Sequence, residues 1–79
     1  MKPQNVQEAQ GALLGKRVHV YHKGANTPAI LIADLDRIIT VTNVRYPPSG
    51  MREDPLYVLV DDVGDQWCVW EETEVTVVP

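Results

Sequence analysis

The sequence has no phenylalanine, a single cysteine, and no lysine or arginine after Arg52. A lone Cys68 excludes an internal disulfide, and no group of Cys and His residues has the spacing of a zinc site. His19 and His22 lie three positions apart, so a regular strand would point them to opposite faces. We therefore expect no metal site.

Long apolar runs are also missing. No stretch approaches the roughly eighteen apolar residues of a membrane-spanning helix, and the first ten residues lack the apolar run of a secretory signal. We expect a cytoplasmic protein without membrane contact. A chain of 79 residues makes one domain that buries only about 60% of its unfolded surface, so we expect self-association to reinforce it.

The charges are distributed unevenly along the chain. All seven Lys and Arg lie at or before Arg52, whereas residues 53–79 carry eight carboxylates and no base. The net charge of −4 disfavours general binding to phosphate backbones, which makes nucleic acid an unlikely partner. In a sheet, the basic early strands can lie beside the acidic late ones.

The first fourteen residues predict a short helix or a flexible arm. Asn5 and Glu8 have the spacing of a capping box, and Val6, Ala9 and Leu13 follow at helical spacing before Gly15. Two turns are too few to be stable alone in water. We expect residues 1–14 to fray or to dock on a neighbour.

From Arg17 onward, Val, Ile, Thr and Tyr dominate, and Gly or Pro recurs about every ten residues, which is typical of short strands. The predicted strands cover residues 17–23, 29–33, 38–46, 56–60, 66–70 and 75–78. Residues 23–28 and 47–55 are predicted loops, 61–65 a tight turn that needs Gly64, and 71–74 one turn of 3₁₀ helix. Five or six short antiparallel strands with such a turn before the last predict an all-β, SH3-like barrel over residues 15–79.

Two stretches carry a resemblance to the Tudor and KOW branch of the SH3-like superfold. They are residues 15–21, Gly-Lys-Arg-Val-His-Val-Tyr, and residues 57–67, Tyr-Val-Leu-Val-Asp-Asp-Val-Gly-Asp-Gln-Trp. Tudor domains use aromatic cages to bind methylated Lys or Arg, so the resemblance implies a binding role. The chain is also similar in size and layout to the type II dihydrofolate reductases, but residues 66–70, Gln-Trp-Cys-Val-Trp, replace their V-Q-I-Y strand. We therefore expect no cofactor.

The candidate binding residues are aromatic or lie in the proline-rich loop. They are Tyr21, Tyr46, Tyr57, Trp67 and Trp70, together with Met51 and Arg52 of the 47–55 loop. Three roles are open for these aromatic side chains: they line a cage for a cation, they form an interface with a protein, or they pack in a core that has no phenylalanine. If one strand spans residues 66–70, Trp67 and Trp70 face opposite sides, so only one points inward.

Catalysis finds little support, because Cys68 lies mid-strand among acids and Ser49 has no neighbouring base. The sequence therefore predicts a non-catalytic binding module for a protein partner that also self-associates through apolar strand edges. One alternative is a small oligomeric enzyme with its site at a subunit interface, as in the type II reductases. A weaker alternative is a KOW-like nucleic-acid adaptor using Lys16, Arg17, Lys23, Arg37 and Arg45. Small barrels of this kind are also common cargo of mobile elements.

Overall fold

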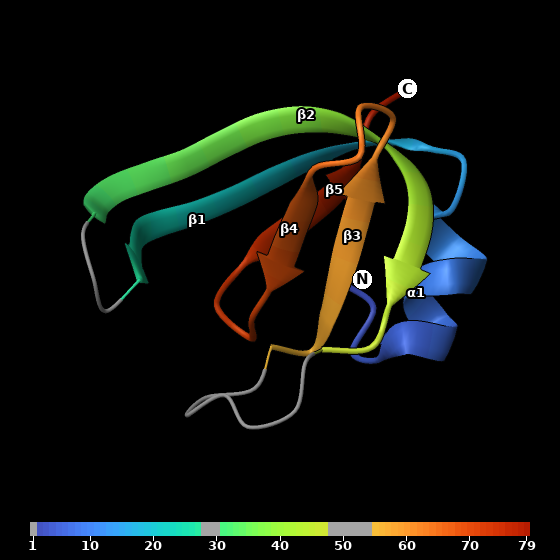
Figure 1. Ribbon diagram of the computed structural model, residues 1–79, viewed down its shortest axis with the longest axis horizontal. Helices are drawn as coiled ribbons and strands as arrows, with labels where there is room; N and C mark the ends of the chain where they lie inside the picture. Colours follow the sequence, from blue (N-terminus) through green and yellow to red (C-terminus); the bar gives the residue numbers. More distant parts are fainter. Residues whose placement is uncertain (1, 28–30, 48–54) are drawn as a thin grey trace.

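The computed structural model describes residues 2–27, 31–47 and 55–79, which form one short helix and one antiparallel sheet (Figure 1). In chain order the elements are α1 (Val6–Leu13), β1 (Arg17–Thr27), β2 (Leu31–Arg45), β3 (Tyr57–Asp61), β4 (Gln66–Val69) and β5 (Glu74–Val77). The strand order is β4-β3-β2-β1-β5, so the last strand returns to pair with the first. The predicted all-β class, with five antiparallel strands, is confirmed.

The β1–β2 hairpin is longer than predicted. Residues 23–27 were expected to be loop, but β1 continues to Thr27, and β2 runs without a break from Leu31. The pairing of Ala25 with Ala33 holds these residues in the sheet, and a register shift between His22 and Ala25 takes up the irregularity. Cross-strand pairing thus outweighs the local turn signal of Gly24. Of the predicted strand at 29–33, residues 29 and 30 lie outside the described part.

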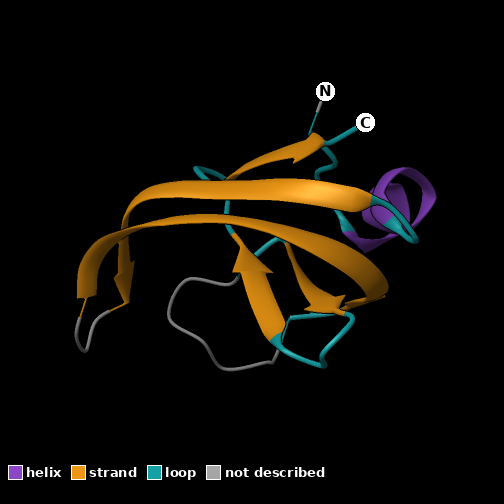
Figure 2. Cartoon of the chain, turned by 90° about the horizontal axis from the view of Figure 1, so that it is seen from above, coloured by secondary structure: helices purple, strands orange, loops and turns teal. Residues whose placement is uncertain are grey.

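The sheet bends around its own core because β2 serves both halves. Residues up to Thr40 pair with β1, whereas Val41–Arg45 pairs with β3. A register shift between Val41 and Asn43 marks the bend. Seen from above, the two long strands sweep across the molecule and curl over at their ends (Figure 2).

Helix α1 docks on the chain's own sheet. The Asn5 side chain accepts a hydrogen bond from the Glu8 amide at 2.9 Å, as the capping pattern predicts. Gly15, with φ of 79°, follows the helix in the left-handed conformation that glycine tolerates best. The helix packs mainly against β2 and β3, and its apolar stripe of Val6, Ala9 and Leu13 is buried. The predicted arm is therefore part of the core.

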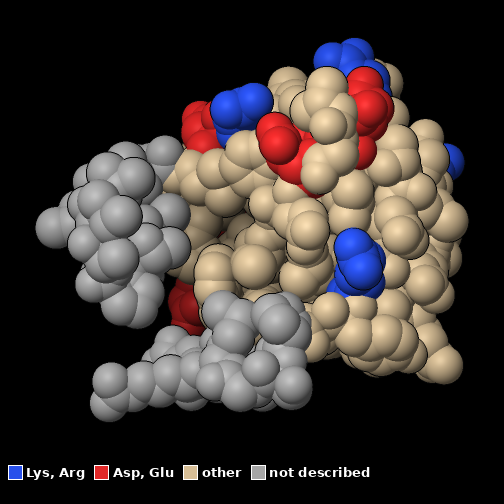
Figure 3. Space-filling view, viewed as in Figure 1, with Lys and Arg blue, Asp and Glu red and all other residues tan. Residues whose placement is uncertain are grey.

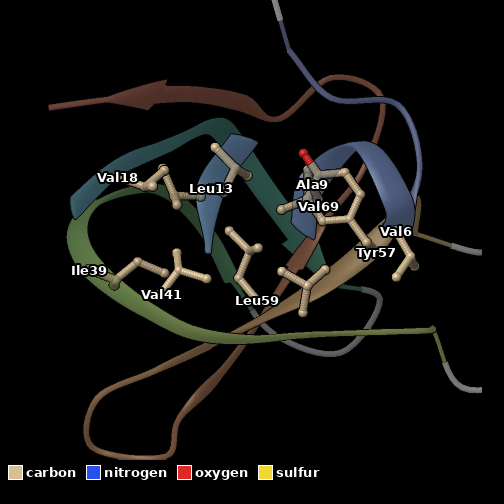
Figure 4. Close-up of a cluster of buried hydrophobic side chains, with 11 residues drawn as sticks. Val6, Ala9, Leu13, Val18, Ile39, Val41, Tyr57, Leu59 and Val69 are labelled. Carbon is tan, nitrogen blue, oxygen red and sulfur yellow. The ribbon is translucent and has the colours of Figure 1, made fainter. Parts of the chain in front are cut away.

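The core is aliphatic with one aromatic ring. On β1, Val18 and Val20 are fully buried while His19 and Tyr21 are half-buried, which is the alternation of a strand that packs one face on the core. The remaining buried cluster comprises Ile39, Val41, Val44, Tyr57, Leu59 and Val69, together with the three helix residues (Figure 4). Tyr57 takes the place that phenylalanine fills in other small domains.

The connection from β4 to β5 is a single turn at Glu71 and Glu72, but it is not the 3₁₀ helix predicted for residues 71–74, because Glu74 already belongs to β5. The Thr73 amide donates to the Trp70 carbonyl at 3.1 Å, which closes a turn of the i to i+3 type.

Helices in the described ranges are too short and too polar for any of them to cross a membrane.

Candidate functional site

The turn between β3 and β4 is organised by the carboxylate of Asp61, the last residue of β3. Its Oδ1 accepts from the amides of Val63 at 3.0 Å and Asp65 at 2.8 Å, and its Oδ2 accepts from Trp67 Nε1 at 2.8 Å. Gly64, with φ of 89°, allows the chain to reverse. The indole hydrogen bond lowers the pKa of Asp61; burial opposes this, and the turn amides add to it. Asp61 thus caps the tight turn that the sequence predicts over residues 61–65.

Trp67 is fixed on two sides. Its indole N–H is bound by Asp61, and the Arg37 guanidinium carbon lies 5.0 Å from the ring centroid, in cation–π geometry. The ring also packs against the buried cluster and remains half-exposed. A cation from the same chain therefore already covers one face of this ring.

Trp70 lies just beyond β4, at the start of the turn. Its ring meets the His22 ring edge to face at a centroid separation of 6.0 Å. Its amide donates to Thr73 Oγ1 at 2.9 Å, and His22 Nδ1 lies 2.7 Å from the same oxygen. The hydroxyl of the buried Thr73 thus joins Trp70 to β1.

Both tryptophans contact the same face of the β1–β2 hairpin. His22 pairs with Leu35, and Arg37 is two residues further along β2, so these side chains share the core-facing side. The sequence predicts opposite faces for Trp67 and Trp70 if one strand spans residues 66–70. Because β4 ends at Val69, strand alternation does not extend to Trp70, and the two rings can lie on the same side. We call Trp67, Trp70, His22, Leu35 and Arg37 the tryptophan surface.

Lys2 fastens the N-terminal segment to the turn between β4 and β5. Its Nζ donates to the carbonyls of Trp70 at 2.9 Å, Glu71 at 2.5 Å and Thr73 at 2.8 Å. The next residue, Pro3, accepts a hydrogen bond from the Tyr57 hydroxyl at 3.2 Å. Sequence reasoning missed Lys2, because its partners are 68 to 71 positions away and no local pattern signals them.

Replacing Lys2 with methionine is expected to lower the free energy of unfolding by about 1–2 kcal/mol, because three hydrogen bonds from a charged donor are lost at a partly exposed site. Lys16→Met removes the same charge at an exposed position and serves as the control. Urea titrations followed by circular dichroism measure both. Equal effects of the two changes would show that the carbonyl contacts do not stabilise the fold.

The other predicted binding residues lie elsewhere. Tyr57 is fully buried, and this burial, aided by the Glu8 charge, raises its pKa to about 12. Tyr21 is half-buried on the outer face of β1, 6.4 Å from the His19 ring between centroids. Tyr46 is 74% exposed just after β2. Met51 and Arg52 lie outside the described residues.

The described residues offer no grouping of three or more His, Cys, Asp or Glu side chains that would hold a metal ion. Cys68 is half-buried in β4, and its burial raises the pKa of the thiol. A protonated thiol is a poor nucleophile at neutral pH.

A shallow open groove of about 640 Å³ is lined by residues of β1, β2 and β5 and by the two residues that follow β5. It is lined by His19, Asp36, Arg37, Ile38, Thr76, Val77, Val78 and Pro79. Within it, His19 Nε2 lies 2.5 Å from Asp36 Oδ1. Ile38 and Val77 are 53% and 44% exposed, so the groove presents apolar surface beside the β5 edge.

Comparison with protein-family models, with curated proteins and with solved structures gave no match. Function is therefore inferred from the geometry of the chain itself.

Proposed function

We propose that the chain is an SH3-like barrel that acts as a non-catalytic binding module, and that it takes an extended segment of a protein partner on the tryptophan surface. The fold assignment is supported by a bent five-stranded antiparallel sheet in which β5 returns to β1 after a single turn. These features add to the resemblance to the Tudor and KOW branch, which rests on the sequences of residues 15–21 and 57–67. A cytoplasmic setting, where the thiol of Cys68 stays reduced, suits this role.

The observation that carries the proposal is the fixed position of two half-exposed tryptophans. Asp61 and Arg37 hold Trp67, while His22 and the turn at Thr73 hold Trp70. Large aromatic side chains are the commonest anchors of protein interfaces. Since these rings are already ordered, binding costs little additional side-chain entropy.

The charge around the surface indicates the chemistry of the partner. The turns on either side of β4 carry four exposed carboxylates, at Asp62, Asp65, Glu71 and Glu72. At the top of the view, acidic side chains lie beside basic ones, and the face below is largely uncharged apart from a basic side chain near its centre (Figure 3). A segment that combines apolar residues with Lys or Arg complements this arrangement.

The test selects binders from a library of random dodecapeptides displayed on phage and measures their Kd by fluorescence anisotropy. We expect basic, apolar peptides whose affinity falls as salt rises. Trp70→Ala should weaken them by about 2 kcal/mol or more, roughly thirtyfold in Kd. The fold should survive, because the backbone contacts of residue 70 with Thr73 and Lys2 do not need the indole.

Tyr21→Ala is the matched control, since it removes an aromatic ring from the outer face of the same hairpin. Its Kd should stay within about twofold of the wild-type value. Peptides that bind wild type and Trp70→Ala equally would place the binding site elsewhere. A library that yields no binder would overturn the proposal.

A further inference from the structure

The β5 edge is the more exposed of the two outer edges of the sheet. Glu74, Thr76 and Val77 are all exposed, whereas in β4 only Gln66 is. Among the described strands, β5 pairs with β1 alone. One side of its backbone therefore faces outward.

The hydrogen-bond pattern identifies which backbone groups face outward. The Val78 amide donates to the Arg17 carbonyl at 2.8 Å, and the ladder continues with Thr76 opposite His19 and Glu74 opposite Tyr21. In an antiparallel ladder, alternate residues turn their N–H and C=O groups to the neighbouring strand. The groups of Val75 and Val77 consequently point to the open edge.

Apart from the short length of β5 and the charge of Glu74 at its start, this edge lacks the usual protection against strand addition. Natural edge strands are commonly blocked by a lysine, a proline, a bulge or a covering loop. Between Glu74 and Pro79, however, the residues are Val75, Thr76, Val77 and Val78, without charge or proline. The exposed Ile38 and Val77 lie in the groove alongside.

We propose that the β5 edge pairs with the β5 edge of a second copy of this chain, antiparallel and about a two-fold axis at Thr76. In this register Val75 of each copy lies opposite Val77 of the other. Two such pairs form four backbone hydrogen bonds. The two Thr76 side chains then meet across the axis, a favourable cross-strand pair.

Charge complementarity favours a second copy as the occupant. In the same register, Glu74 of one copy lies opposite Val78 of the other, and Val78 is paired with Arg17 in its own sheet. Glu74 and Arg17 of the second copy thus lie two strands apart on the same face, about 10 Å between backbones, within reach of two long side chains. Within one chain they are separated by about 13 Å along the ladder, since Glu74 pairs with Tyr21.

The interface is small, so the dimer is expected to be weak, with a Kd on the order of 10⁻⁴ M. Sedimentation equilibrium from about 10 µM to about 1 mM in low salt covers this range. Val77→Pro removes the outward amide but none of the bonds to β1, and it should weaken association roughly tenfold or more. Val77→Ala keeps that amide and should have a smaller effect.

A charge swap tests the register. Glu74→Arg and Arg17→Glu should each weaken association about three- to tenfold at low salt, and the double variant should restore it. The Trp70→Ala variant, which removes an anchor of the proposed peptide site, should associate like wild type. Failure of the peptide site would therefore leave the dimer inference standing, and failure of the dimer would leave the peptide site standing. A wild type that remains monomeric at about 1 mM, an unaffected Val77→Pro, or a double variant without restoration would each overturn the inference.

Discussion

Replacing Tyr57 with alanine is expected to destabilise the fold by about 3–5 kcal/mol, because the change removes the largest fully buried side chain and leaves a cavity. A domain of this size has a total stability of only about 5–8 kcal/mol. Only about 0–5 kcal/mol should therefore remain, and the midpoint of thermal unfolding should fall by more than about 10 °C. Circular dichroism during thermal and urea unfolding measures the loss.

The size of the effect follows from the composition of the core. The sequence offers no phenylalanine, and Tyr57 is the one aromatic residue of the buried cluster. Its ring lies among Ala9, Val69 and Val6, so it joins α1 to the sheet (Figure 4). Removing it weakens the packing of α1 on the sheet, and a helix of eight residues is not stable alone.

Tyr57→Phe is the matched control. It keeps the ring and loses the hydroxyl bond to the Pro3 carbonyl, at a cost of about 1 kcal/mol. Because folding raises the pKa of Tyr57 from 10.0 to about 12, the contribution of its neutral form is complete below pH 10 and is lost as the pH rises toward 12. The phenylalanine variant should lack this alkaline loss. Equal stability of Tyr57→Ala and Tyr57→Phe would show that the ring does not stabilise the core.

The parts of the fold that could be predicted from the sequence are those with local causes. Val18 and Val20 alternate with polar neighbours, which gives the inner face of β1 directly. Gly64 and Asp61 place the β3–β4 turn, since positive φ and side-chain capping are properties of a few adjacent residues. The N-cap of α1 also has a local cause, because Asn5 accepts a hydrogen bond from the amide of Glu8, three residues along the chain.

The candidate site was less predictable because it depends on contacts between distant segments. The Lys2 ammonium meets the turn after β4 only in the folded chain. Arg37, noted in the sequence only as a basic residue for nucleic acid, instead stacks on Trp67. Tyr57 and Trp67 are both large aromatic residues with one hydrogen-bonding group, yet folding buries the first completely and leaves the second half-exposed. Periodicity alone does not distinguish these outcomes.

Asp61→Ala is expected to lower the midpoint of thermal unfolding by roughly 10 °C or more, because three donors lose their acceptor at once. Asp62→Ala changes the next residue, which is exposed in the same turn, and should leave the midpoint within about 2 °C. Asp61→Asn tests the charge separately from the shape. The asparagine side chain has an NH₂ group where the carboxylate has its second oxygen. This NH₂ group cannot accept a hydrogen bond, so either the indole N–H or the turn amides lose their acceptor.

The acid dependence of stability follows from the same contacts. Since folding lowers the pKa of Asp61 below its ordinary 3.8, the stabilisation is complete above that value and is lost as the pH falls through the folded-state pKa. Wild type should therefore lose more stability than Asp61→Asn when both are titrated downward from about pH 5. Parallel acid curves would contradict the assigned role of this carboxylate.

Asp61 also connects stability to the proposed binding surface. Without its acceptor, the Trp67 indole N–H must find water, so the ring loses one of its two fixed neighbours while Arg37 remains. At a temperature where Asp61→Asn is still folded, its tryptophan emission should shift to the red, and the selected peptides should bind more weakly than to Asp62→Ala. An unchanged affinity would mean that the partner depends on Trp70 and not on the fixed position of Trp67.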